Sequence, residues 1–304
     1  MKLSISTSAF AGLYKNHAES LEVCSKSKFK HMDMSLSFVT ENPDFLKEVD
    51  DILVNKEKYG ITFTMGHAPF KYNPFMSQEH FDNQMIDIKN ALKSASLLGI
   101  DRVTVHGGAS FAESQEDLLN KNVEYFKQIL EIAEKYNIIV MLENISSKIR
   151  NRPFDVETAE DILYVADKLN YHPLFKACWD SGHANTIGLG QYDNIIKLKD
   201  LIYGVHLQDN NGYSDDHMVP LLGTINFDET IQGLKDINYQ GPFNFEIHVF
   251  NDGNTWPNFR QKYSENYKGE QLLFDPDDEL RYLGIDLMYN VALYMAKKHN
   301  ITLE

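Results

Sequence analysis

The residues best suited to chemistry lie in the stretch 176–185, which reads Lys-Ala-Cys-Trp-Asp-Ser-Gly-His-Ala-Asn. A short apolar run reaches Trp179 and is followed by Asp180 and, three residues later, by His183. A carboxylate and an imidazole at this spacing, where a buried strand gives way to a Gly-containing loop, suit a divalent metal or a polar substrate. In parallel α/β folds, chemistry gathers at the carboxyl ends of strands, because the strand fixes the side chain while the loop admits the ligand.

Partners for these two residues follow other predicted strands. His67, His106, Glu143, His206 and Glu246 each come directly after a short apolar run. Taken singly, each has an ordinary structural explanation, such as a helix cap or a carboxylate that accepts hydrogen bonds from loop amides. Isolated acids at the ends of apolar strands are nevertheless costly to desolvate unless they are paired or bind a metal. Six consecutive strands that end in His, Asp or Glu therefore predict one shared site.

The elements that must position these side chains recur with a regular spacing. Strand patterns repeat roughly every 30–40 residues with helical patterns between them, which is typical of a (β/α)₈ barrel. The predicted strands are 3–7, 29–37, 60–66, 101–105, 138–142, 176–179, 202–205 and 242–245. The predicted helices are 18–25, 42–54, 78–98, 115–136, 156–169, 192–199, 227–237 and 278–298. No linker-like stretch divides the chain, so we expect a single α/β TIM-barrel domain over residues 1–304 with a C-terminal extension helix.

Composition limits the possible partners and the compartment. The chain has 29 basic and 44 acidic residues, a net charge of −15. This charge argues against nonspecific binding to nucleic acid or to an anionic membrane. Cys24 and Cys178 lie far apart, which predicts no disulfide framework and a reducing compartment. The 304-residue sequence contains no apolar run of membrane-spanning length. We expect a cytoplasmic protein that acts on a small molecule.

The last four strands supply the strongest candidate ligand set. Glu143, Asp180, His206 and Glu246 offer three carboxylates and one imidazole. Such a hard, mostly oxygen set suits Mn²⁺, Mg²⁺ or Co²⁺, and Zn²⁺ also fits it. Because four protein ligands leave coordination positions open, substrate oxygens can complete the shell. We predict one divalent metal and no organic cofactor.

Four motifs carry a resemblance to a known group: Leu142-Glu-Asn144, Asp180-Ser-Gly-His-Ala184, Val205-His-Leu-Gln-Asp209 and Phe245-Glu-Ile-His248. Together they resemble the xylose isomerase-like TIM-barrel superfamily. That group contains sugar and sugar-phosphate isomerases and epimerases, hydroxypyruvate isomerase, inosose dehydratase and the endonuclease IV type of abasic-site nuclease.

The sugar-acting members imply a mechanism for this chain. The resemblance implies that Glu143, Asp180, His206 and Glu246 hold one metal. It also implies that Glu143 and Glu246 form a catalytic acid/base pair, which moves a proton through an enediolate of a small carbohydrate. His183 would then hydrogen-bond a substrate oxygen.

Other residues are candidates for substrate contact. Ketose 3-epimerases of the superfamily carry an arginine shortly after the strand-seven histidine, whereas this loop reads Gln208-Asp-Asn-Asn-Gly212. Arg150 and Arg152 are either a carboxylate or phosphate site or part of a solvated loop. His67, His106 and Trp256 are further candidates. The late aromatics are either a wall over the sugar or a subunit contact in a homo-oligomer; they are Phe250, Trp256, Phe259 and Tyr263.

Two alternatives stay open. An inosose-dehydratase-like lyase uses the same metal site. An endonuclease IV-like phosphodiesterase uses a three-metal cluster, and the resemblance places its nine ligands on His67, His106, Glu143, Asp180, His183, His206, Asp215, His217 and Glu246. Asp215 and His217 would thus serve an additional metal. The net charge of −15 opposes a duplex-binding function, so the sequence favours a metal-dependent sugar isomerase or epimerase.

Overall fold

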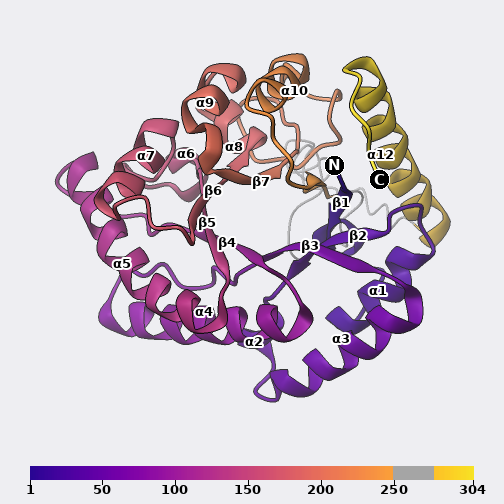
Figure 1. The fold of residues 1–304 in the computed structure, drawn as a ribbon, viewed down its shortest axis with the longest axis horizontal. Helices are drawn as coiled ribbons and strands as arrows, with labels where there is room; N and C mark the ends of the chain where they lie inside the picture. Colours follow the sequence, from indigo (N-terminus) through magenta and orange to yellow (C-terminus); the bar gives the residue numbers. More distant parts are fainter. Residues whose placement is uncertain (249–276) are drawn as a thin grey trace, which may run out of the picture.

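The computed structural model describes residues 1–248 and 277–304, and its centre is a sheet of eight parallel strands (Figure 1). The strands are β1 (Leu3–Ser6), β2 (His31–Ser35), β3 (Thr62–His67), β4 (Arg102–His106), β5 (Ile139–Glu143), β6 (Phe175–Asp180), β7 (Ile202–His206) and β8 (Phe243–Phe245). Their order in the sheet is β7-β6-β5-β4-β3-β2-β1-β8, so β8 is hydrogen-bonded to β1 rather than to β7.

The two edges of this sheet meet just beyond β7. A bridge joins Leu207 to Phe245, and the Leu207 amide donates a hydrogen bond to the Asn244 carbonyl at 2.9 Å. The sheet therefore curls into a nearly closed barrel, and the predicted (β/α)₈ TIM-barrel fold is confirmed. Closure brings the carboxyl ends of β3 to β8 to one mouth.

Helices surround the barrel (Figure 1). The α-helices are α1 (His17–Ser25), α2 (Phe38–Glu41), α3 (Phe45–Tyr59), α4 (Gln78–Leu98), α5 (Gln115–Tyr136), α6 (Ser147–Arg150), α7 (Ala159–Lys168), α8 (Ser181–Thr186), α9 (Gln191–Leu198), α10 (Phe227–Asp236) and α12 (Asp278–Lys298), and two short 3₁₀ turns are η1 (Thr7–Phe10) and η2 (Lys199–Leu201). The C-terminal helix α12 completes the ring between α10 and α1, where Lys298 pairs with Asp228 of α10. None of the helices within the described ranges combines the length and apolar composition that a membrane crossing requires.

Along β5 and β6, side chains alternate between the core under the helices and the interior of the barrel. Trp179 belongs to the main core between strands and helices, and its indole nitrogen donates a hydrogen bond to Gln191 of α9 at 2.9 Å. Met141 and Cys178 belong instead to a small apolar cluster with Met65. Because successive residues of a strand point to opposite sides, Glu143 and Asp180 lie on the same side as Met141 and Cys178, two residues nearer the mouth.

One local expectation was wrong. The segment after β6 was expected to be a loop, but it forms the short helix α8. Asp180 is the N-cap of this helix, and its Oδ1 accepts a hydrogen bond from the His183 amide at 2.6 Å. The cap satisfies one of the amides that every helix start leaves without an intrahelical acceptor. Capping and a metal-ligand function are compatible, because the second oxygen of Asp180 is not used by the cap.

Candidate metal centre

The four predicted central ligands meet at the mouth of the barrel. One ligand atom from each of Glu143, Asp180, His206 and Glu246 lies within 4.8 Å of the others, and we call these residues the central group. The Nδ1 of His206 is 2.6 Å from Glu143 Oε1 and 3.1 Å from Glu246 Oε2. Glu143, Asp180 and His206 are fully buried.

The donor atoms of the central group fit a divalent cation. Two ligand atoms on opposite sides of a cation are about 4.2 Å apart when each metal–ligand bond is about 2.1 Å long. The ligand atoms of the central group lie within 4.8 Å of one another, which is close to this distance. In addition, Asp180 Oδ2 is buried and has no hydrogen-bond partner among the described residues. An unpaired buried carboxylate oxygen is costly, and a bound cation would satisfy it.

Two further groups adjoin the central group. Glu143 Oε2 lies 2.8 Å from His106 Nε2 and 3.5 Å from His67 Nε2. On the other side, Asp215 Oδ2 lies 3.3 Å from His183 Nε2 and 3.1 Å from His217 Nε2. The structure therefore gathers all nine residues that the endonuclease resemblance named, in three adjoining groups.

His183 is held by protein atoms on both sides of its ring. Its Nδ1 lies 2.9 Å from the Asn144 carbonyl oxygen, and its Nε2 faces Asp215. A hydrogen bond from Nδ1 to this carbonyl leaves the Nε2 lone pair directed toward the Asp215 carboxylate. This arrangement suits a ligand of the group His183–Asp215–His217, which we call the outer group.

The electrostatics of the site favour cations. Burial raises the pKa of Glu143, but the nearby His206 and His106 outweigh it and hold this pKa well below its usual range. Glu246 shows the same balance, since His206 and His217 lower its pKa against the effect of burial. Burial, only partly offset by His183, raises the pKa of Asp180 to about 7. The two glutamates therefore stay ionised at neutral pH and present negative charge to a cation.

Asp33 is a site residue that the sequence analysis missed. It is fully buried on β2, its Oδ2 lies 3.4 Å from His206 Nε2, and the Asn244 side-chain amide donates to the same oxygen at 3.2 Å. This nearby carboxylate favours the neutral His206 tautomer that carries its proton on Nε2, and the Nδ1 lone pair of that tautomer faces the central group. The available signal was a carboxylate in the middle of an otherwise buried strand.

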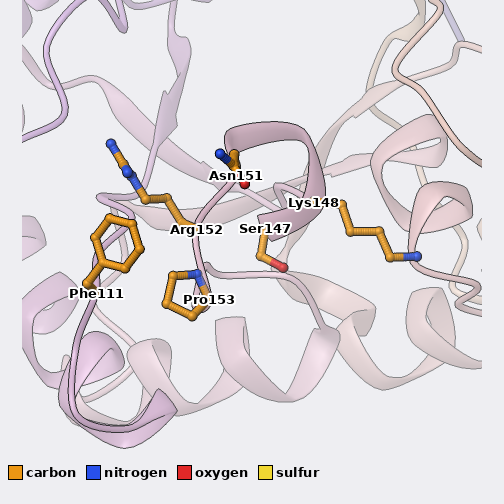
Figure 2. Close-up of a pocket in the computed structure, with 6 residues that line it drawn as sticks. All are labelled: Phe111, Ser147, Lys148, Asn151, Arg152 and Pro153. Carbon is orange, nitrogen blue, oxygen red and sulfur yellow. The ribbon is translucent and has the colours of Figure 1, made fainter.

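Both predicted arginines are already engaged by other protein groups. Arg150 Nη1 donates to the Gly107 carbonyl at 2.8 Å and lies 3.4 Å from Asp155, so its charge is already paired. Arg152 lies over the ring of Phe111, with 4.7 Å between the guanidinium carbon and the ring centre. Both Arg152 and Lys148 line a cavity of about 380 Å³, but Figure 2 shows them pointing away from each other. The two cations therefore do not form a cradle for one anion. None of the candidate ligands lines this cavity.

One exposed aromatic ring lies at the mouth. Phe70 stacks on His106 with 4.5 Å between ring centres and is 56% exposed, so an apolar face borders the candidate site. The sequence pattern around Phe70 did not mark it as a site residue. The predicted substrate contact Trp256 lies outside the described residues, as do Phe250, Phe259 and Tyr263.

Fold and site together define a TIM barrel with a buried carboxylate and histidine cluster at its mouth. Residues 21–266 match the family of xylose isomerase-like TIM barrels, and the chain belongs to that family. The suspected superfamily is thereby confirmed.

Comparisons with individual proteins point to two kinds of relative. The chain is 28% identical over 275 residues to an uncharacterized protein of Methanocaldococcus jannaschii, and the aligned region covers 87% of this chain and 90% of that protein. It is 25% identical to a D-psicose 3-epimerase of Enterocloster bolteae (65% of each chain) and 27% identical to a probable endonuclease 4 of Mycoplasmopsis pulmonis (64% and 73%). A solved D-tagatose 3-epimerase-like protein shares the fold with a TM-score of 0.73, 22% identity and coverage of 98% and 99%.

Proposed function

We propose that this protein is a divalent-metal-dependent isomerase or epimerase of a small sugar or sugar-like carbonyl compound. The observation that carries the proposal is the central group, in which Glu143, Asp180, His206 and Glu246 present three carboxylates and an imidazole within 4.8 Å at the mouth of the barrel. The epimerase relatives, one of them similar over almost the whole chain, support this reading.

The residues of the site have distinct proposed roles. Asp33 orients His206, while Glu143 and Glu246, both close to His206 Nδ1, are the acid/base pair that takes a proton from the substrate carbon and returns one. A bound divalent cation supplies Lewis-acid polarisation of the substrate carbonyl and hydroxyl. Phe70 offers an apolar face against which the C–H face of a sugar ring can pack.

Metal content and proton exchange test the proposal together. Protein purified without chelator should carry one equivalent of manganese, magnesium, cobalt or zinc by mass spectrometry. It should also introduce solvent deuterium beside the carbonyl of at least one member of a panel of ketoses and ketose phosphates. Protein that binds no divalent metal at millimolar concentration would contradict the proposal.

A second function is favoured by a specific observation. The group His67–His106–Glu143 shares Glu143 with the central group, and the outer group also adjoins the central group. In addition, a probable endonuclease 4 is among the relatives. Three neighbouring cations could activate water and stabilise the leaving oxygen of a phosphodiester. The net charge of −15 opposes this reading, because a duplex binder depends on Lys and Arg at the phosphates. We therefore place it second.

Replacement of His217 by alanine separates the two functions. His217 contributes to the outer group but lies outside the central group. With one catalytic metal, we expect His217→Ala to keep one metal equivalent and most of the turnover. The phosphodiesterase would be favoured if the wild type carries two or three equivalents of zinc and cleaves abasic-site DNA, and if His217→Ala carries fewer equivalents. His172→Ala is the control, because His172 pairs with Glu134 on the outside of the barrel.

A further inference from the structure

A buried glutamine amide lies between the central group and the outer group. Gln208 follows β7 and is fully buried. Its Nε2 is 2.6 Å from Asp215 Oδ1 and 3.3 Å from Asp180 Oδ1. Its backbone is held by Ser181, whose hydroxyl donates to the Gln208 carbonyl at 2.8 Å. The amide thus bridges one carboxylate from each group.

The hydrogen-bonding capacity of the amide matches this position. A side-chain NH₂ group has two hydrogens, and here it can give one to each carboxylate. Asp180 Oδ1 then accepts from Gln208 and from the His183 amide, so the unpartnered Oδ2 is the oxygen left for the central group. Likewise, Asp215 Oδ1 is fixed by Gln208 while its Oδ2 faces His183 and His217. A carboxylate or a hydrocarbon at position 208 could donate to neither.

Gly182 leaves the room that this amide occupies. A Cβ atom at position 182 would lie 2.1 Å from the Cδ of Gln208 and 2.3 Å from its Nε2. Any larger residue at position 182 would therefore push the amide away from the two carboxylates. This close approach, inside the first turn of α8, explains a glycine two residues after Asp180 without any demand on the backbone angles.

The geometry points to Gln208 as a positioning residue that joins the two groups and raises the affinity of the central group for a divalent cation. Without its two donated hydrogen bonds, Asp180 and Asp215 each lose one of the partners that orient them, although the His183 amide still caps Asp180 and both histidines still face Asp215. This inference rests on the proposed function, since it assumes that the central group binds a cation. Hydrogen bonds that orient metal ligands typically contribute about 10- to 100-fold in metal affinity.

The experiment measures metal binding rather than turnover. Chelator-treated wild type and Gln208→Leu are titrated with Mn²⁺ by calorimetry and with Co²⁺ by visible absorption. We expect Gln208→Leu to bind Mn²⁺ about 10- to 100-fold more weakly and to give an altered Co²⁺ spectrum. Gly182→Ala should weaken Mn²⁺ binding to a similar extent, because the added methyl group displaces the Gln208 amide without removing it. If Gln208→Leu does not fold, the Mn²⁺ affinity of Gly182→Ala tests the inference instead.

A matched control comes from a second buried glutamine beside the same segment. Gln191 accepts from the Trp179 indole and donates to the Ser181 carbonyl, each at 2.9 Å, but it contacts neither carboxylate in these hydrogen bonds. Gln191→Leu should lower thermal stability and leave the Mn²⁺ affinity unchanged. The inference about Gln208 is overturned if Gln208→Leu and Gly182→Ala keep the wild-type Mn²⁺ affinity, or if Gln191→Leu loses as much Mn²⁺ affinity as they do. Either outcome leaves the proposed function standing. A wild type that binds neither Mn²⁺ nor Co²⁺ overturns the proposed function as well.

Discussion

Metal removal by a chelator should abolish turnover and lower the midpoint of thermal unfolding, and added Mn²⁺ should restore both. Glu143, Asp180 and Glu246 place three carboxylates within one small volume, and Asp33 and Asp215 lie close by. A cation at 100 times its Kd stabilises the folded state by about 2.7 kcal/mol. For a chain of 304 residues, that amounts to a rise of about 4 °C in the unfolding midpoint.

Calorimetry on chelator-treated and reloaded protein measures this difference directly. Lower pH should reduce it, because protons compete with the metal for its ligands. Burial raises the pKa of Asp180 to about 7, so this carboxyl holds a proton at pH 5 and has largely lost it above pH 7. The stabilisation by Mn²⁺ should accordingly be large at pH 8 and small at pH 5. Equal unfolding midpoints with and without Mn²⁺ at pH 8 would mean that the central group serves another purpose.

The barrel and the ends of its strands could be predicted because the signals are local. An apolar run that ends in His67, Glu143 or Asp180 is visible in a few residues, and (β/α)₈ closure then brings the ends together. The bounds of α4 and α5 were predicted correctly for the same reason. Their first residues follow the capping serines Ser77 and Ser114, and a left-handed Gly or Asn ends each helix.

Contacts between distant segments could not be predicted in this way. Asp33 reads as one polar residue in a strand, and only barrel closure brings it to His206 and Asn244. The pairing of Arg150 with Asp155 depends on the path of the intervening loop, so the sequence left an anion site and a solvated loop open and gave no sign of this ion pair. The position of Gln208 could not be predicted from the sequence either, because it depends on which carboxylates approach its side-chain amide.

Glu143→Gln is the single substitution with the largest expected effect on chemistry. Glu143 belongs to the central group, and it is also in contact with His106 and His67. Glutamine keeps the volume but has no carboxylate, so it cannot exchange a proton with substrate at neutral pH. The loss of a positioned acid/base group typically costs about 10²- to 10⁴-fold in rate. Solvent-deuterium exchange into substrate, measured beside metal content, should therefore fall by at least two orders of magnitude, or about 100-fold.

A neighbouring glutamate provides the control for this result. Glu157 accepts a hydrogen bond from the Ser147 amide at 2.8 Å, in the loop that follows β5, and belongs to none of the three ligand groups. Glu157→Gln should therefore exchange protons at nearly the wild-type rate. Near-normal exchange in Glu143→Gln would show that this carboxylate does not move the proton. If Glu143→Gln instead keeps its metal but loses exchange, the carboxylate is needed for proton transfer itself and not only for holding the cation.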